Sequence, residues 1–357
     1  MLFRSHVPRV LYRWRAAEGS AALDPDGKPW AYAAGIRAVQ AHCDRLGIDA
    51  TVEPTDIVGV HRLARRLKAQ PLVSIVVPTA GSVGTVYGHS SLMIERCIDS
   101  IFAKSTYGNL EVVCILDATW RGNRPVETLI DRYEGQPVRF LTDAKPFNFS
   151  YKINLGAFHA RGSRLVLLND DTEVITPDWI EAMLGLIEEG DVGLVGCALL
   201  HEDSTAQHAG QYLNDKPHHV LYGIPFSEPG PMSCLRTERE CAGVTAACVM
   251  TRRDVFEAVG GFTEGLPNNY NDVDFSLKIR AAGMRVVWTP WARLWHFEST
   301  SRAQSARELD LSRGNRVQQT EQIFLRRRWH TALNSDPYLT DTLRVDLDQP
   351  AEYQLWR

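Results

Sequence analysis

The stretch from Arg164 to Asp178, RLVLLNDDTEVITPD, constrains the fold of this chain more than any other segment. Its apolar run, Leu165 to Leu168, shows no polar alternation, which is typical of a strand covered on both faces in a parallel sheet. The triplet Asn169 to Asp171 ends the run, and a threonine followed by a proline predicts a helix over roughly 178–189. Strand, acidic tip and helix in this order predict an α/β fold that binds its ligand at the carboxyl ends of parallel strands.

The acidic tip predicts a divalent metal site. Asp170 and Asp171 supply hard oxygen ligands of the kind that Mg²⁺ and Mn²⁺ take, and such ions are commonly shared with substrate phosphates. The alternative is that the two carboxylates only cap a loop, which is the ordinary explanation for an isolated pair. Their position directly after a buried strand favours ligand binding.

Composition excludes several classes of protein. The 357 residues are 44% hydrophobic and 23% charged, with a net charge of −4 and a pI near 6.3, which argues against a general nucleic-acid binder. The seven cysteines form no CxxC pair, so neither a disulfide framework nor a structural zinc site is indicated. No apolar stretch approaches the roughly 18 residues of a membrane span. Arginines near the N-terminus occupy the region where a signal peptide would need an apolar core. We therefore expect a soluble, cytoplasmic protein.

Residues 1–70 predict a small α/β extension. A short arm over 1–27 is expected to pack its aromatic residues on the main domain. A helix over Trp30 to Leu46 should end at Gly47, and a short strand should follow over Ile48 to Val52. Helical spacing then predicts a second helix over Val58 to Lys68, whose arginines are expected to form a solvated face.

Beyond residue 70, apolar strands alternate with helices. The predicted strands are Leu72–Pro78, Leu110–Leu116, Val138–Leu141 and Leu165–Leu168, and the predicted helices are Leu92–Ala103, Val126–Tyr133 and Tyr151–Ala160. This alternation predicts a doubly wound, mostly parallel sheet of nucleotide-binding type. Neither GxGxxG nor GxxxxGK[ST] occurs, so phosphate would have to be held through a metal ion instead.

The second half, residues 191–302, predicts a mixed region. Strands are expected over Val192–Leu199, Val244–Thr251, Arg285–Trp291 and Arg293–Ser299, and helices over Arg252–Val259 and from Asp272 to the stop at Gly283. His201, His208, His218 and His219 are spaced irregularly and are predicted to be loop and core residues rather than a metal cluster. If extended, His296 and Glu298 share one face of their strand.

Seven motifs in order carry a family resemblance: SIVVPT, the strand ending in Asp117, the Asn154-Leu-Gly segment, LLNDDTEV with PDW, TAACVMTRRDVFEAVGGF, YNDVDFSLKIRAAG and LWHFESTSR. Together they resemble a family 2 inverting glycosyltransferase of the GT-A fold, in particular the bacterial branch for O-antigen and rhamnose-type surface polysaccharides. The resemblance covers roughly residues 70–302. It implies a nucleotide-sugar half over 71–190, an acceptor half over 191–302, and a C-terminal helix and tail over 303–357.

The resemblance also implies roles on the donor side. Thr79 ends the first strand of the donor half, Asp117 would contact the nucleotide base, and Asn154 would line the donor pocket. Asp170 would belong to the same pocket. This chain departs from the family after Thr79, where a glycine-rich insertion over residues 80–91 precedes the first helix.

For the metal and the chemistry, the resemblance implies four residues. Asp171 would be the metal carboxylate, because Asn169 replaces the first acid of the family motif, and His296 would be a second ligand. Asp272 would be the general base, with Asp274 as a supporting acid near the acceptor. Single displacement with one base inverts the anomeric centre.

The expected activity is transfer of a sugar from a UDP-, dTDP- or GDP-linked donor to a glycan or lipid-linked acceptor, with Mn²⁺ or Mg²⁺ as cofactor. Two alternatives are a non-catalytic glycan- or nucleotide-sugar-binding protein and a sugar-phosphate nucleotidyltransferase. Arg326 to Arg328 end a helix predicted over Arg302 to Trp329. These arginines either complement the helix dipole or contact an anionic membrane as a peripheral anchor.

Overall fold

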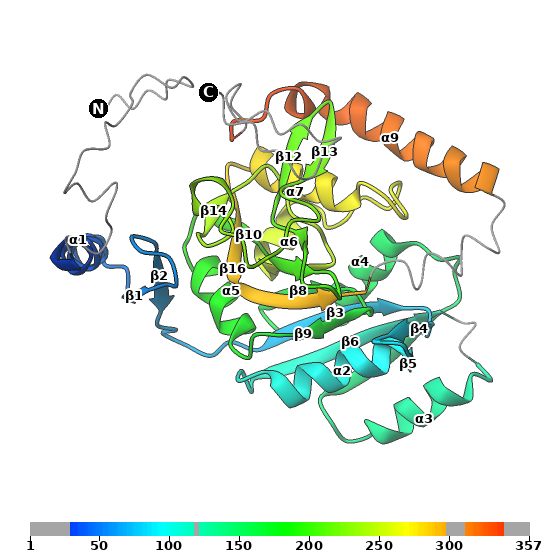
Figure 1. The fold of residues 1–357 in the computed structure, drawn as a ribbon. Coiled ribbons are helices and arrows are strands. Elements are labelled where there is room, and N and C mark those ends of the chain that lie inside the picture. Colours follow the sequence, from blue (N-terminus) through cyan, green and yellow to red (C-terminus); the bar gives the residue numbers. More distant parts are fainter. Residues whose placement is uncertain (1–28, 118–120, 298–310, 339–357) are drawn as a thin grey trace.

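The computed structural model describes residues 29–117, 121–297 and 311–338. Its centre is one sheet with helices on both faces (Figure 1). The strands of this sheet are β3 (Val73–Thr79), β6 (Leu110–Asp117), β7 (Val138–Asp143), β8 (Arg164–Leu168), β9 (Thr172–Val174), β10 (Val192–Leu200), β11 (Ala206–His208), β14 (Arg239–Glu240), β15 (Cys248–Arg252) and β16 (Arg285–His296).

The strand order is β14-β16-β10-β15-β8-β3-β6-β7, with β11 added to β10 and β9 added to β16. β3 runs parallel to β6 and β8, β6 runs parallel to β7, and β10 runs parallel to β16. β15 is antiparallel to both of its neighbours, β10 and β8, and so separates two parallel blocks. The predicted α/β class, with a mostly parallel first half and a mixed second half, is confirmed.

Apolar side chains on alternate residues build two cores. Ile75 and Val77 of β3 face α2 (Met93–Lys104), α3 (Arg124–Arg132) and α5 (Trp179–Ile187), whereas Val76 faces α4 (Phe149–His159), α6 (Arg253–Ala258) and α7 (Asn271–Ala281). Gly156 lets α4 approach the sheet closely, because a Cβ there would lie 2.3 Å from Val76 Cγ1. The result is a three-layer α/β/α domain.

A buried carboxylate links the beginnings of β3 and β6, at the opposite end of these strands from the acidic tip. Glu111, near the start of β6, accepts hydrogen bonds from Ser74 Oγ at 2.7 Å and from Arg161 N and Nε at 2.6 and 2.8 Å. Burial alone would raise the pKa of Glu111, but these hydrogen bonds outweigh it and lower the pKa below its ordinary value of 4.5. The charged form of Glu111 therefore stabilises the folded state.

One predicted helix at the N-terminal side is wrong. α1 (Pro29–Leu46) ends before Gly47 as predicted, but the segment predicted as a second helix contains strand β2 (His61–Arg65), antiparallel to β1 (Ala50–Pro54). Two of its three arginines do not belong to a solvated face. Arg62 pairs with Asp178 at 2.5 Å, and Arg65 pairs with Glu189 and Glu238 at 2.9 and 2.7 Å, which fastens β2 to both ends of α5 and to the segment before β14. Arg66 is largely exposed, as predicted. Arginines recruited by distant acids override the local helical spacing.

Two further predictions are corrected in detail. The helix after the acidic tip begins at Trp179, and Thr176 does not cap it, because the Thr176 hydroxyl accepts a hydrogen bond from Arg293 N at 2.9 Å. The two extended pieces predicted over residues 285–299 form one strand, β16, whose pairing with β10 shifts register once near Pro290. Glu298 and the arm over 1–27 lie outside the described residues.

Smaller elements surround the sheet. The glycine-rich insertion forms a hairpin of β4 (Val83–Val86) and β5 (His89–Leu92), whose two-residue turn, Tyr87-Gly88, has φ values of 50° and 79°. Both positive angles match the turn type that suits the twist of a short hairpin. A second hairpin pairs β12 (Gln211–Asn214) with β13 (Lys216–His219), and a 3₁₀ turn covers Pro231–Ser233.

The last described helix, α9 (Leu311–Leu333), packs on the α7 side of the domain (Figure 1). Its backbone departs from helical geometry at Trp329, where φ is −121° and ψ is 23°, and this is the residue at which the sequence predicted the helix end. A last turn continues to Leu333, and residues 302–310 lie outside the described part of the chain. No helix among the described residues combines the length and apolar character needed to cross a bilayer.

Candidate active site

The carboxyl ends of β3, β6 and β8 bring predicted donor-side residues to one edge of the sheet. Thr79 lies opposite Leu116 in the parallel pairing of β3 with β6, so Asp117 follows directly beside it. On the other side, the Thr79 hydroxyl donates a hydrogen bond to Asp170 Oδ2 at 2.5 Å. Neighbouring strands are about 5 Å apart, so Thr79 stands between the two acids.

Asp170 is half-buried and lies next to a second carboxylate, that of the buried Asp171. Burial, and then the adjacent Asp171, raise the pKa of Asp170 to about 7, against the opposing effects of Thr79 and His296. Two carboxylates held this close resist carrying two negative charges at once. A divalent cation would relieve that repulsion.

Asp171 and His296 face each other. β9 runs antiparallel to the end of β16, which puts Thr172 opposite His296, and Phe297 N donates to Asp171 O at 2.9 Å. As a result Asp171 Oδ1 lies 3.1 Å from His296 Nε2, with both side chains more than nine-tenths buried. The sequence prediction that these two residues belong together is supported by this contact.

The pair fits a divalent metal ion. Two ligand atoms that each lie about 2.1 Å from one ion, at right angles, are about 3 Å apart, close to the 3.1 Å between Asp171 Oδ1 and His296 Nε2. Among the residues that the structure describes, no group of three or more His, Cys, Asp or Glu side chains is arranged to hold an ion. The remaining ligands would have to be water and substrate phosphate oxygens, as in many Mg²⁺ sites.

Gln207 of β11 holds the far side of the His296 ring. Its Oε1 accepts a hydrogen bond from His296 Nδ1, and its Nε2 donates to His296 O at 3.3 Å. Gln207 is buried. Sequence reasoning missed this residue, and the segment Ala206 to Ala209, which also contains the polar His208, gave no local signal for it.

The base-side acid, Asp117, is ion-paired with a lysine that the sequence did not single out. Lys152 of α4 is fully buried, and its ammonium group contacts Asp117 Oδ1 and lies 5.6 Å from the ring centre of Phe147. Phe147 is 47% exposed, so an aromatic face remains open next to this ion pair. Asp117 and Phe147 thus offer hydrogen-bond acceptors beside an accessible ring.

Asn154 has a different set of contacts from the one predicted. Its Oδ1 accepts from Phe262 N at 2.8 Å, and its Nδ2 donates to Phe262 O at 2.9 Å. Both ends of the amide therefore fix the loop after α6 to α4. The prediction that Asn154 lines a donor pocket stays a prediction.

Asp272 lies in the first turn of α7 and is partly exposed. Its Oδ1 accepts from Val273 N at 2.8 Å and its Oδ2 accepts from Gln211 Nε2 at 3.4 Å. Gln211 and the histidine-binding Gln207 are four residues apart, so their Cα atoms are at most about 14 Å apart. One short segment therefore contacts both the predicted base and the predicted metal ligand.

Asp274 does not lie beside Asp272. Residues two apart on a helix project about 200° apart, and Asp274 is fully buried on the α9 side. It accepts from Thr263 Oγ1 at 2.6 Å and from Trp329 Nε1 at 2.7 Å, and Arg328 lies 3.4 Å away. These contacts dock α9 on α7, and the role of Asp274 as a supporting acid near the acceptor stays a prediction.

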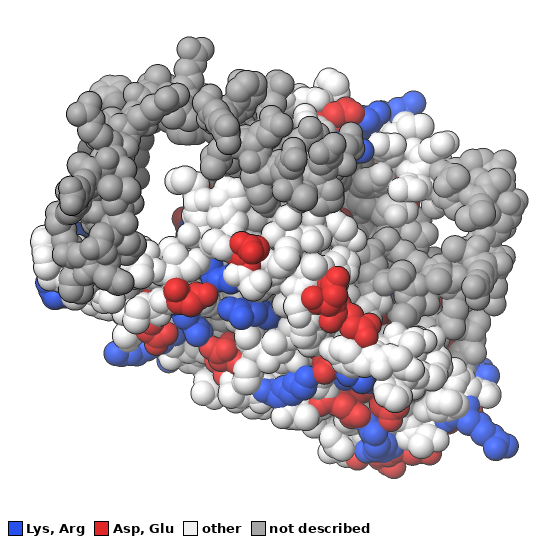
Figure 2. Space-filling model, in the orientation of Figure 1, with Lys and Arg blue, Asp and Glu red and all other residues white. Residues whose placement is uncertain are grey.

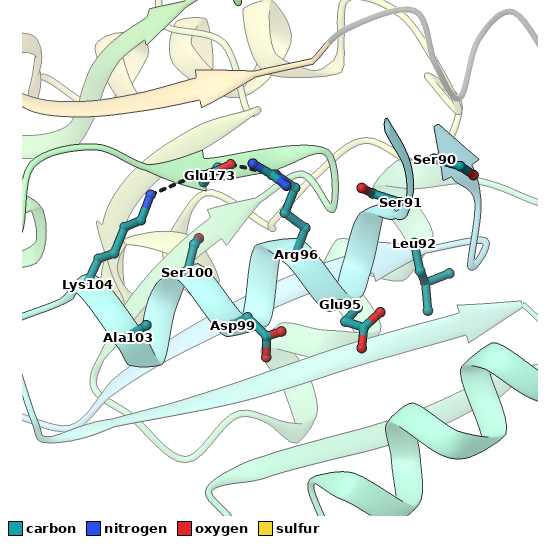
Figure 3. A pocket seen from close by; sticks show the side chains of 10 residues that line it. All are labelled: Ser90, Ser91, Leu92, Glu95, Arg96, Asp99, Ser100, Ala103, Lys104 and Glu173. Carbon is teal, nitrogen blue, oxygen red and sulfur yellow. Dashed lines mark hydrogen bonds and ion pairs between the residues drawn. The ribbon is translucent and has the colours of Figure 1, made fainter. Parts of the chain in front are cut away.

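Ion pairs with α2 anchor β9. Glu173 accepts from Arg96 and Lys104, both at 2.6 Å, on the rim of an open hollow of about 450 Å³ (Figure 3). Acidic and basic side chains alternate over α2 and α3 on this face (Figure 2). The charged residues that line the hollow are all ion-paired, Glu173 with Arg96 and Lys104, and Glu95 and Asp99 with Arg132 of α3. The pairs of Glu173 fasten β9, which directly follows the acidic tip, to α2.

The glycine-rich hairpin reaches the metal side of the site. Tyr87 at its turn packs edge-on against Phe297, with ring centres 5.7 Å apart, and Arg96 lies over both rings. Phe297 directly follows His296. The insertion therefore braces the end of β16.

Comparison with known proteins gives a family and a fold. The family described as "Glycosyl transferase family 2" matches residues 74–260, just over half of the chain. A solved structure, titled as GalNAc-T7 with UDP, GalNAc and Mn²⁺, is similar with a TM-score of 0.53 at 15% identity, covering 76% of this chain and 52% of that one. At this identity the likeness supports the fold alone.

Two curated relatives are longer than this chain. One, described as uncharacterized protein y4gI of Sinorhizobium fredii (strain NBRC 101917 / NGR234), is 36% identical over 96% of this chain and 37% of its own length. Another, O-antigen biosynthesis protein RfbC of Myxococcus xanthus, is 33% identical over 84% of this chain and 23% of its own. The chain thus spans about a third and a quarter of the relatives that it matches.

Proposed function

Because this chain belongs to glycosyl transferase family 2, we propose that it transfers a sugar from a nucleoside-diphosphate donor to a hydroxyl group of a glycan or lipid-linked acceptor. The observation that carries the proposal is the contact between Asp171 and His296 at the carboxyl ends of the strands. It lies at the sheet edge where α/β proteins bind ligands. The alternative of a nucleotidyltransferase is disfavoured by the family match.

On the donor side, Asp117 and Lys152 would select the base. A carboxylate paired with an ammonium group offers only acceptors. It would therefore favour a base with a ring N–H donor, such as uracil, thymine or guanine, over cytosine. Phe147, with its exposed ring, would stack on the base. UDP-, dTDP- and GDP-linked sugars all meet this requirement.

At the diphosphate, Asp171 Oδ1 and His296 Nε2 would hold a divalent ion. Bound there, such an ion neutralises the negative charge that develops on the leaving diphosphate. A nitrogen ligand favours Mn²⁺ over Mg²⁺, and Mn²⁺ is bound in the similar GalNAc-T7 structure. Asp170, held by Thr79, keeps Asp171 oriented through the shared backbone turn.

For the transfer itself, Asp272 would act as general base. Its carboxylate is held by Val273 N and Gln211 but keeps lone pairs and partial exposure toward solvent. The acceptor hydroxyl would lose its proton to Asp272 as its oxygen forms a bond to the anomeric carbon and the bond to the diphosphate breaks. One displacement inverts that carbon, so no carboxylate nucleophile is required.

The acceptor class is proposed from the relatives. RfbC of Myxococcus xanthus is described as an O-antigen biosynthesis protein, which supports a role in cell-surface polysaccharide synthesis. A peripheral membrane contact through Arg326 to Arg328 finds less support. Arg326 pairs with Asp215 at 2.6 Å and Arg328 pairs with Asp274, so two of the three charges are engaged within the chain.

Thermal shifts with UDP, dTDP, GDP and CMP, each with and without Mn²⁺, test the proposal, because a ligand of the native state alone raises its stability. We expect a metal-dependent shift with at least one of the three diphosphates, none with CMP, and loss of the shift in Asp171→Ala. Asp272→Asn should keep the shift and lose sugar transfer. No shift with any nucleotide at millimolar concentration would contradict the proposal and favour a non-catalytic glycan-binding protein.

A further inference from the structure

Gln207 makes contacts that a residue present only for packing would not need. It lies in the middle of β11, is 3% exposed, and both polar atoms of its amide bond to one residue, His296. Burying an amide is unfavourable unless its hydrogen bonds are satisfied. In this case both hydrogen-bond partners of the amide belong to His296. One is its ring, which is part of the proposed metal site, and the other is its backbone carbonyl.

The backbone of His296 determines which way the Gln207 amide points. The carbonyl oxygen of His296 only accepts hydrogen bonds, so the group 3.3 Å from it must be the NH₂ of Gln207. The Gln207 oxygen is then the atom that faces His296 Nδ1. Because that oxygen only accepts, Nδ1 must carry the ring proton.

A proton on Nδ1 has a direct consequence on the other side of the ring. In a neutral imidazole Nε2 then carries the lone pair, and this nitrogen lies 3.1 Å from Asp171 Oδ1 and 3.4 Å from Asn169 Nδ2. A histidine that binds a metal through one nitrogen commonly donates from the other to a fixed acceptor. The arrangement around His296 has this form.

We propose that Gln207 is the positioning residue of the metal site, which fixes the tautomer and the ring orientation of His296 so that Nε2 can bind a divalent cation together with Asp171. The inference rests on the proposed function and deepens it, because it assigns the cation-binding state of His296 to a residue outside the family motifs identified in the sequence. Gln207 contacts the ring but not the ion, the sugar or the diphosphate.

Gln211 provides a matched control. It has the same side chain, the same 3% exposure and a position four residues further along the chain, but its amide donates to Asp272 instead of a histidine. Loss of either glutamine removes one buried amide from the same region. Only loss of Gln207 should alter the cation site.

The first experiment measures Mn²⁺ affinity in the presence of saturating UDP or GDP, by calorimetry or by the electron paramagnetic resonance signal of free Mn²⁺. We expect Gln207→Leu to weaken Mn²⁺ binding by about 10- to 100-fold, the usual effect of removing an outer partner of a metal ligand. Gln211→Leu should bind Mn²⁺ with the affinity of the unsubstituted protein. Equal Mn²⁺ affinity in Gln207→Leu and the unsubstituted protein would overturn the inference.

The second experiment reads the tautomer directly and needs neither metal nor nucleotide. In ¹⁵N spectra of the histidine-labelled protein, with the His296 signals assigned by their loss in His296→Asn, we expect a proton on Nδ1. Gln207→Glu retains an acceptor for Nδ1–H and should keep this proton, whereas in Gln207→Leu the ring proton should distribute between Nδ1 and Nε2. A ring that is protonated on Nε2 and not on Nδ1 in the unsubstituted protein would refute the role of Gln207.

The two measurements separate this inference from the proposed function. A protein that binds no Mn²⁺ with any nucleotide, yet shows the expected His296 tautomer, contradicts the transferase proposal and leaves the action of Gln207 on the ring intact. A protein that binds Mn²⁺ in an Asp171-dependent way, with Gln207→Leu unaffected, supports the transferase proposal and refutes the role of Gln207.

Discussion

Lys152→Met should show how strongly the nucleotide-side ion pair is tied to the stability of the domain. Lys152 of α4 is fully buried, and its ammonium group is paired with Asp117. Removing one partner of a buried ion pair costs about 3–5 kcal/mol, because the remaining charge loses its counterion. The Asp117 side chain keeps 14% of its surface exposed and can be partly hydrated, so we expect the lower end, about 3 kcal/mol.

The assay is equilibrium urea unfolding at pH 7, followed by circular dichroism. Methionine has nearly the volume of lysine without its charge, so the substitution leaves little cavity. Asp117→Asn should also destabilise the protein, since it strands the buried ammonium. The double variant Asp117→Asn with Lys152→Met removes both charges. Its loss of unfolding free energy should be smaller than the sum of the two single losses by about 2 kcal/mol.

Two results would refute this reasoning. If Lys152→Met loses less than about 1 kcal/mol, the ion pair is hydrated and not buried as the contacts indicate. If the losses of the single variants simply add in the double variant, Lys152 and Asp117 are not energetically coupled. In either case the acceptor-only character proposed for Asp117 would lose its basis.

Three further substitutions test the structure. Asp274→Asn should cost about 2–4 kcal/mol and expose α9 to limited proteolysis, because it removes a buried charge with several partners, whereas Asp272→Asn on the same helix should leave α9 protected. Glu111→Gln should be less stable than the unsubstituted protein at pH 7. This difference in stability should shrink as the pH falls below 4.5, because a carboxyl group whose pKa is lowered in the folded state loses its stabilising effect as it becomes protonated. A pH-independent difference in urea titrations would contradict this. Gly156→Ala should cost about 1–3 kcal/mol by overpacking, with the same change at Gly190, where nothing lies within 4 Å, as the control.

Most of the central sheet could be predicted from the sequence because its signals are local. Strands β3, β6, β8 and β10 are nearly continuous apolar runs, and a run of this kind needs no knowledge of its partners to be recognised. The same holds for α1, which ends before Gly47, where φ is +69°. Most boundaries lie within two residues of the prediction, but β15 begins at Cys248, four residues after the predicted start at Val244.

Strand β2 was missed because its structure depends on distant residues. The segment from Val58 to Lys68 has apolar spacing that suits a helix, yet Arg62 and Arg65 bind acids that lie more than a hundred residues away in the sequence. Pairing with β1 and these ion pairs together outweigh a weak helical preference. No local window contains that information.

The residues of the candidate site divide in the same way between those with a local sequence signal and those defined by distant contacts. Asp170 and Asp171 could be found because they directly follow a predicted buried strand, whereas His296 was implied by the family resemblance. The contact of Asp171 with His296 follows from the pairing of β9 with β16. The role of Asp274 stays a prediction, because a motif names residues without telling which face of the helix meets the ligand. Lys152 and Gln207 could not be found, since a buried polar side chain has no sequence signature apart from its partner.

The pairing of β9 with β16 also determines when the candidate site is completed during synthesis of the chain. Thr172 meets its strand partner only at His296, about 120 residues later, and β10 likewise waits for β16 as its parallel neighbour. Closing loops of this length is slow and entropically costly, so these pairings form late in folding. A ribosome-bound chain that already displays the acidic tip still lacks the histidine opposite it. Under the proposed function, capture of a metal and a donor would begin only after β16 has emerged and paired with β9 and β10.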